Sequence, residues 1–262
     1  MTKPFSHALV VGHPGHELRA FRWMELNRPL VYVLTDGSGL LGATRIESTR
    51  AVLAAAGATA GPIFAPLTDR QLYDSLLAGD ARRVVALAER LAETLSSAGV
   101  VTVAGDAAEG FNPTHDLCRA LLDAAIARCA SAGARSIENL AFALDGRPDM
   151  VPPGVPAAAV TRLELDADAL LRKLGAARGY PEMRGEVEAA VSRFGEESFA
   201  VETFWRSASP ADAASVGAEP PFYERHGESR VAAGVYREIV RAGEHVQPMV
   251  DALRDWAAGG SA

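Results

Sequence analysis

Residues 7–39, HALVVGHPGHELRAFRWMELNRPLVYVLTDGSG, contain the pattern that indicates the fold class. The stretch contains two apolar runs, at 7–12 and 29–35, and each has the length of a buried strand. The residues between them have helical composition and are too many for a hairpin, so the two strands are expected to run parallel. We therefore predict a strand, a crossover helix and a second strand.

The same alternation continues along the chain. Helical patterns occur at 45–56, 80–97 and 115–132, and another buried strand is predicted at 99–104. Gly57 follows the first of these helices as a C-cap. Strands that alternate with helices indicate an α/β protein. The sequence thus predicts a Rossmann-like, mostly parallel sheet with helices on both faces.

The second half of the chain is less regular. Strands are predicted at 157–165 and 198–206, and helices are predicted at 163–177 and 184–193. Residues 207–221 have the composition of a loop or linker, and a final helical region is expected over 228–257, kinked or divided by Pro248. We divide the chain into an α/β core with the candidate site, 1–160, and a C-terminal part, 161–262, that completes the fold and the substrate side.

The composition excludes two kinds of partner. With 26 Lys and Arg against 33 Asp and Glu, the chain has a net charge of −7 and no basic stripe, which argues against a nucleic-acid partner. No run approaches the roughly 18 apolar residues of a membrane span, and the N-terminal residues lack signal-peptide features. We expect a cytoplasmic protein. Its two cysteines, Cys118 and Cys129, fall in one predicted helix, too far apart to pair.

Three loops are expected at the carboxyl edge of the sheet, where α/β proteins bind ligands: 12–17, 36–42 and 105–115. His13 and His16 lie in the first loop, and His115 lies at the end of the third. Neutral imidazoles suit zinc, and three of them leave a fourth position open to water, as in catalytic zinc sites. The arrangement indicates a candidate zinc site at these three histidines.

Two other interpretations of the turn GHPGHE, residues 12–17, are open at this point. A histidine pair in a turn is often a capping or hydrogen-bonding pair, and spacing by itself does not separate this role from metal binding. A phosphate-binding loop is the weaker alternative, because only Gly12 and Gly15 are present and there is no Lys.

The order of these motifs resembles the LmbE-like or PIG-L-like deacetylases, which remove acetyl groups from N-acetylglucosaminyl compounds with zinc. The resemblance rests on the His-Pro-x-x-Glu turn at 13–17, TDGSG at 35–39, the helix that opens at Arg45, and Asn-Pro-Thr-His at 112–115. It covers residues 7–135 in order and, less specifically, 171–180 and 202–207. It implies a zinc-dependent hydrolase with a small, polar, sugar-like substrate.

Carried over by this resemblance, His13 matches the first zinc ligand and His115 matches the last histidine ligand. His16 stands where the family has an aspartate ligand, and an imidazole can still coordinate zinc there. Glu17 matches the signature glutamate. Arg45 matches an arginine that faces the substrate.

The chain departs from the family at two catalytic positions. Gly15 replaces the general-base aspartate, so we expect Gly15→Asp to raise hydrolysis. Asn112 replaces a histidine that stabilises the oxyanion, and its amide can still donate a hydrogen bond. Asp36 is our first candidate for a replacement base, and Glu17 is the second. Their structural alternatives are a turn residue for Asp36 and an orienting partner of a ligating histidine for Glu17.

Three functions of different classes follow. The first is a zinc-dependent hydrolase acting on an N-acyl group of a small, sugar-like metabolite. The second is a diverged, non-hydrolytic relative that binds a metabolite or a metal, because the base is missing. The third is another α/β enzyme, such as a glycosyl-transfer protein, whose GHPGHE turn binds phosphate. The helical region at 228–257 either packs on the core, joins copies in a homo-oligomer, or closes over the site.

Overall fold

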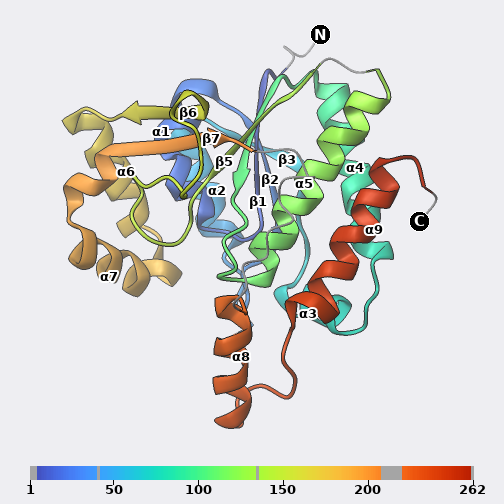
Figure 1. The fold of residues 1–262 in the computed structure, drawn as a ribbon. Helices are drawn as coiled ribbons and strands as arrows, with labels where there is room; N and C mark the ends of the chain where they lie inside the picture. The colour runs from blue at the N-terminus through green and yellow to red at the C-terminus, as the bar shows by residue number, and fades with distance from the viewer. Residues whose placement is uncertain (1–4, 40–41, 134–135, 208–219, 261–262) are drawn as a thin grey trace.

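The structure is a computed structural model that describes residues 5–39, 42–133, 136–207 and 220–260. A seven-stranded sheet runs through its middle (Figure 1). In spatial order the strands are β3 (Thr59–Leu67), β2 (Leu30–Thr35), β1 (His7–Val11), β4 (Thr102–Asp106), β5 (Glu138–Phe142), β7 (Val201–Arg206) and β6 (Val160–Glu164). The first five are parallel, and β7 pairs antiparallel with both of its neighbours. The predicted α/β class and mostly parallel sheet are confirmed.

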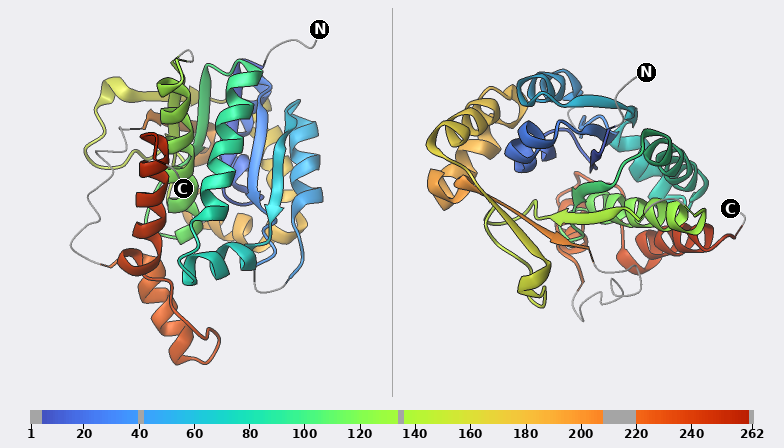
Figure 2. Two further views of the ribbon diagram at one scale, coloured as in Figure 1. Left: turned by 90° about the vertical axis from the view of Figure 1, so that its right-hand side faces the viewer. Right: turned by 90° about the horizontal axis from the view of Figure 1, so that it is seen from above.

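Helices cover both faces of the sheet, as predicted (Figures 1 and 2). One face carries α1 (Phe21–Asn27), α2 (Ile46–Ala56), α6 (Ala167–Arg178) and α7 (Arg184–Phe194). The other carries α3 (Asp69–Leu77), α4 (Arg82–Ala98), α5 (Pro113–Ser131) and α9 (Gln247–Ala257). The remaining helix, α8 (Phe222–Ala232), projects beyond the carboxyl ends of the parallel strands. Short turns of helix complete the fold: η1 (His16–Ala20), η2 (Ala157–Ala159), η3 (Pro181–Met183), η4 (Glu196–Ala200) and η5 (Ala242–Val246).

The central strands are apolar throughout because both of their faces are covered. Along β1, Leu9 and Val11 pack into the core beneath α1 and α2, while Ala8 and Val10 pack into the core beneath α4 and α5. All four side chains are fully buried. This burial on both faces explains why continuous apolar runs, and not alternating ones, identify the strands.

The early sequence predictions agree with the structure to within a few residues. The crossover between β1 and β2 is η1 followed by α1, and Gly57 ends α2 with φ 68°. The two cysteines are buried and unpaired. No helix in the described residues is long and apolar enough to cross a membrane. The predicted loop at 207–221 lies largely outside those residues.

The helical region predicted over 228–257, kinked or divided by Pro248, is divided at a different place. The first helix of this part, α8, already begins at Phe222 and ends at Ala232, and residues 233–241 are not helical. The π-helical turn η5 runs directly into α9, and Pro248 is the second residue of α9, next to this junction. The proline therefore lies where the type of helix changes. Strands β3 and β5 and helix α3 were not predicted from the sequence.

Candidate metal centre

The three predicted histidines come together at the carboxyl edge of the sheet. His13 lies in the turn after β1, His16 opens η1, and His115 is the third residue of α5. Ring centres are 5.3 Å apart for His13 and His16, 5.4 Å for His13 and His115, and 4.5 Å for His16 and His115. We call these residues the histidine cluster. Residues about 100 positions apart in sequence thus form one polar centre.

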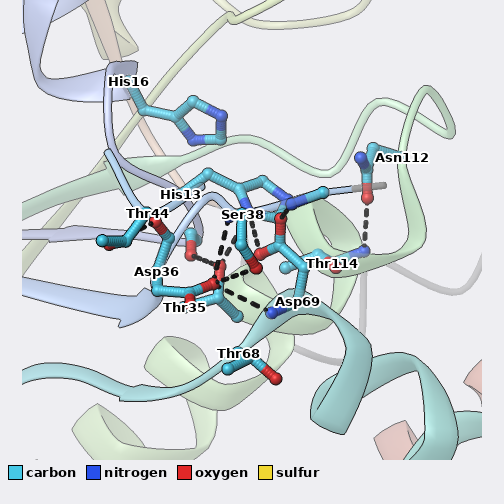
Figure 3. Close-up of polar contacts among 12 residues, drawn as sticks. His13, His16, Thr35, Asp36, Ser38, Thr44, Thr68, Asp69, Asn112 and Thr114 are labelled. Carbon is cyan, nitrogen blue, oxygen red and sulfur yellow. Dashed lines mark hydrogen bonds and ion pairs between the residues drawn. The ribbon is translucent and has the colours of Figure 1, made fainter. Parts of the chain in front are cut away.

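The ring of His13 is oriented by the ends of β2 and β3. Its Nδ1 lies 2.7 Å from Oγ1 of Thr35 and 3.1 Å from Oδ1 of Asp69 (Figure 3). The Thr35 hydroxyl donates its own proton to the carbonyl of Gly12, so it accepts from His13. Nδ1 therefore carries the proton, and Nε2 keeps its lone pair for a ligand. This Nε2 is buried and has no hydrogen-bond partner among the described residues.

His16 is oriented in the same way by the end of β4. Its Nδ1 lies 2.8 Å from Oδ2 of Asp106, whose side chain is fully buried. The same carboxylate oxygen accepts the N–H of Gly12 at 2.7 Å, which joins the ends of β1 and β4. A carboxylate that receives the second ring N–H of a histidine is the usual support of a metal-bound imidazole. Both His13 and His16 have such a support.

His115 completes the cluster from the first turn of α5. The residue is 6% exposed, and its buried Nδ1 has no partner in the described part of the chain. Burial, together with the nearby rings of His16 and His13, lowers the pKa of His115 well below 6.5. The ring is therefore neutral at pH 7, which is the form that binds metals.

The cluster fits a zinc ion in its chemistry and spacing. Two imidazoles that bind one zinc ion at about 2.0–2.1 Å have ring centres about 5 Å apart, close to the distances seen here. Two buried ring nitrogens without partners also call for a ligand. As the side chains stand, however, no set of three or more His, Cys, Asp or Glu residues within the described ranges is arranged to hold a metal ion. The rings pack edge to face, so their nitrogens would have to turn toward a common point.

Glu17 lies beneath the turn and not against the imidazoles. Its Oε2 accepts the N–H of Gly15 at 2.7 Å, and its buried Oε1 has no hydrogen-bond partner among the described residues. Burial raises the pKa of this carboxyl to about 7. The contact with Gly15 shows that Glu17 shapes the turn between the two histidines.

Asp36 is connected to His13 through Asp69, which contacts both residues. Its Oδ1 accepts hydrogen bonds from N and Oγ of Ser38 and from N of Asp69, at 3.0, 2.7 and 3.2 Å (Figure 3). Asp69 in turn contacts His13. Oδ1 of Asp36 thus stabilises the loop. If Asp36 acts directly as a base, its Oδ2 is the atom that takes up the proton.

Asn112 and Arg45, the two other predicted site residues, lie at the N-termini of α5 and α2. Asn112 is the N-cap of α5, and its Oδ1 accepts the N–H of Thr114 at 2.8 Å (Figure 3). This orientation leaves the Nδ2 hydrogens as the atoms that can meet a ligand. Arg45 precedes α2, and its Nη2 lies 3.9 Å from Oε1 of Glu186 on α7. Its guanidinium is therefore placed between the two helices at the rim.

Gly15 has a backbone that strongly favours glycine. Its φ is 103°, and a Cβ at this position would lie 1.9 Å from Sδ of Met183 at the end of η3. The thioether thus fills the space into which any side chain at position 15 would point. An apolar side chain thus occupies the space beside position 15.

Sequence reasoning missed the two carboxylates that orient the histidines. Asp106 ends a buried strand, and an acidic residue at the carboxyl edge of a parallel sheet is a signal that could have found it. Asp69 follows β3, a strand whose Gly61, Pro62 and Pro66 hide the apolar pattern. No local signal pointed to Asp69.

Replacing Asp106 by Asn is expected to weaken Zn²⁺ binding about 10- to 100-fold. The amide still accepts a hydrogen bond from His16, but without its negative charge it no longer raises the basicity of the ring. The measurement is competition for Zn²⁺ with a chelator of known affinity. Asp116→Asn is the control, because within the described part of the chain the side chain of Asp116 bonds backbone N–H groups, those of Glu109 and Gly110, and no histidine. Equal affinities in both variants would show that Asp106 does not act through His16.

The chain has the fold of the LmbE-like deacetylases. No family model and no curated protein matches its sequence. Among solved structures, a triple mutant of a deacetylase of the teicoplanin biosynthetic pathway superposes with a TM-score of 0.52 at 12% identity, over 76% of this chain and 96% of that one.

Two further structures resemble the chain less closely. One is the deacetylase of the A40926 pseudoaglycone, with a TM-score of 0.46, 14% identity, and 78% and 97% of the two chains covered. The other is a zinc-inhibited form of a teicoplanin deacetylase, with a TM-score of 0.46, 12% identity, and 77% and 98% covered. The match at a TM-score of 0.52 confirms the fold that the motifs led us to expect.

Proposed function

We propose that this protein is a zinc-dependent hydrolase that cleaves an N-acyl group from a small, polar, sugar-like metabolite. The observation that carries the proposal is the paired support of His13 and His16. Each directs Nδ1–H to a carboxylate, Asp69 or Asp106, and both lie beside the buried, unpartnered Nδ1 of His115. Such an arrangement stabilises neutral imidazoles and keeps the lone pair of the second ring nitrogen available for a ligand, which a turn or capping role does not require.

When bound, zinc supplies a water of lowered pKa and polarises the acyl carbonyl. The protein's own groups do the rest in this proposal. Asn112 donates its amide N–H to the oxyanion, since its Oδ1 is held by Thr114. Arg45 binds the polar part of the substrate at the rim. Asp36 and Glu17 are the candidate groups for proton transfer.

A second function is favoured by one specific observation, the side chain of Met183 in the place of the missing base. An apolar thioether there neither takes up a proton nor binds water well. A non-hydrolytic relative that keeps the histidine cluster to bind a metal or metabolite would have this arrangement. The two functions predict the same metal content and different turnover.

Turnover of an N-acetyl amino sugar tests the proposal. We expect the zinc-loaded protein to release a primary amine from N-acetylglucosamine or its methyl glycoside, and the chelator-treated protein to release none. Amine is measured with an amine-reactive fluorophore, and activity should return when Zn²⁺ is added back. Full zinc content without amine release from any N-acyl amino sugar would favour the non-hydrolytic function.

Gly15→Asp by itself is expected to lower the thermal midpoint and add no hydrolysis, in contrast to the expectation from sequence. The new side chain meets Met183, and a non-glycine residue at φ 103° costs about 1–3 kcal/mol of stability. Adding Met183→Ala removes the clash, and the double variant is expected to hydrolyse N-acetylglucosamine faster than the parent protein. Met183→Ala alone is the control. A double variant that folds and binds zinc without any gain would show that the chemistry itself has diverged.

A further inference from the structure

Two exposed phenylalanines lie beside the histidine cluster. Of the nine phenylalanines in the chain, all in its described part, only Phe111 and Phe222 are exposed, at 40% and 43%. Phe111 precedes α5, and Phe222 is the first residue of α8. Their rings are stacked, with centres 5.0 Å apart and planes 2° apart. The two exposed rings are therefore one feature, built from segments 111 residues apart in sequence.

A run of ring contacts connects this pair with the cluster. The ring centre of Phe111 lies 6.3 Å from that of His115, and on the other side His226 stacks on Phe222 at 5.6 Å. We call Phe111, Phe222 and His226 the aromatic platform. The distance between Phe111 and His115 is that of neighbouring aromatic rings. A ligand whose reacting group lies at His115 can therefore contact the platform with its other end.

The platform is held in place by the loop before α5. Gly110, with φ 65°, lets Pro221 approach so closely that a Cβ at 110 would lie 3.1 Å from the proline ring. Its carbonyl accepts the N–H of Tyr223, and its N–H donates to Oδ1 of Asp116 at 3.1 Å. The start of α8 is thus fixed to the same loop that carries Phe111. A surface fixed in this way loses little entropy when it binds a ligand.

The platform differs in chemistry from the rest of α8. That helix is otherwise polar on its exposed side, with Arg225 and Glu228 exposed. Apolar rings left in water beside a polar centre are typical of a binding site for a ligand with one polar and one apolar end. Phe111 and His226 both stack on Phe222, so a ligand meets the edges of these rings, and the face of a planar aromatic group packs on such edges better than a branched group does.

We propose that the aromatic platform binds an aromatic or similarly planar apolar group that the substrate carries next to its acylated amine. This inference rests on the proposed function, because the platform recognises the substrate of the histidine cluster. The polar end of the substrate lies at His115 and Asn112, and the planar end lies against Phe222. The platform thus selects amphiphilic substrates over free amino sugars.

The test compares three probes with the zinc-loaded full chain: the methyl, cyclohexyl and phenyl glycosides of N-acetylglucosamine. Affinity is measured by ligand-observed NMR. We expect the phenyl glycoside to bind about 10-fold more tightly than the methyl glycoside, with the cyclohexyl glycoside between them. Saturation transfer should be strongest at the phenyl protons.

Phe222→Ala should remove most of the 10-fold preference, and Phe222→Trp should retain it. Leu171→Ala is the matched control, because Leu171 is a 68% exposed apolar residue on α6, away from the platform. The thermal midpoint of each variant shows whether it folds. Equal affinity for the three glycosides, absence of saturation transfer to the phenyl ring, or an unchanged preference in Phe222→Ala would each overturn the proposal.

Two further measurements separate the alternatives. A preference for the phenyl glycoside without amine release would contradict the proposed hydrolase function and support the platform proposal. Amine release at equal rates from all three glycosides would contradict the platform proposal and support the hydrolase function. The mass of the protein in solution shows whether a second copy of the chain covers the aromatic platform. If Phe222→Ala converts a dimer to a monomer, the rings join two copies of the chain, and the substrate proposal is overturned.

Discussion

Substituting His115 by Ala is expected to reduce bound zinc from about one equivalent to a small fraction of one. The variant leaves two imidazoles, and an ion held by two ligands is exposed and weakly bound. The same result is expected for His13→Ala and His16→Ala, because their ring centres lie within 4.5–5.4 Å of one another and of His115. Elemental analysis of the purified protein gives the zinc content directly.

His7→Ala is the matched control for these three variants. His7 begins the same strand that ends before His13, and its ring contacts Trp23 at the other end of β1. We expect this variant to keep its full zinc content. Stoichiometric zinc after replacement of any one histidine of the cluster would remove that residue from the ligand set, and the capping interpretation would then apply to it.

Glu202→Ala is expected to cause the largest loss of stability, about 3–5 kcal/mol. The carboxylate of Glu202 on β7 is fully buried and accepts the N–H groups of Arg22 and Trp23, each at 2.8 Å. It also accepts a proton of Lys173 Nζ at 2.8 Å. The substitution therefore leaves the first turn of α1 without its acceptor and a buried ammonium without its counter-charge, held only by the carbonyl of Arg19 among the described residues. A thermal midpoint lowered by more than about 6 °C is expected.

Two comparisons assign this loss to the buried charge. Glu25→Ala breaks the contact with Arg172 at the surface and should lower the midpoint far less, because exposed ion pairs contribute little. Combining Lys173→Met with Glu202→Leu removes both charges and should recover part of the loss. A single Glu202 variant as stable as the parent protein would show that neither the helix end nor Lys173 depends on this carboxylate.

Much of the fold could be predicted from local sequence because its central strands are buried on both faces. Strands β1 and β2 are uninterrupted apolar runs, and α4 has a clear amphipathic pattern. Strand β3 was missed because Gly61, Pro62 and Pro66 interrupt its apolar pattern, and it is an edge strand, where proline costs no ladder hydrogen bond. In the helical region predicted at 228–257, the break was expected at Pro248 but lies at residues 233–241.

The candidate site, like the fold, could be predicted from the sequence only in part. The chemistry of His13, His16 and His115 could be inferred from their residue type and from their loops, because parallel strands bring the loops after them to one edge. The carboxylates that orient these histidines could not be inferred from the sequence. Asp69 meets His13 only because β3 lies beside β2, and Asp106 meets His16 only because β4 lies beside β1.

The α/β class, the central strands and the histidines at the carboxyl edge of the sheet could all be read from the residues along the chain. They follow from local apolar patterns and from the rule that parallel strands end at the same side. The position of Met183 beside Gly15 and the stacking of Phe111 on Phe222 became known from the packed structure. Each of these contacts joins segments more than 100 residues apart, and their approach depends on the packing of whole elements, which no local pattern encodes.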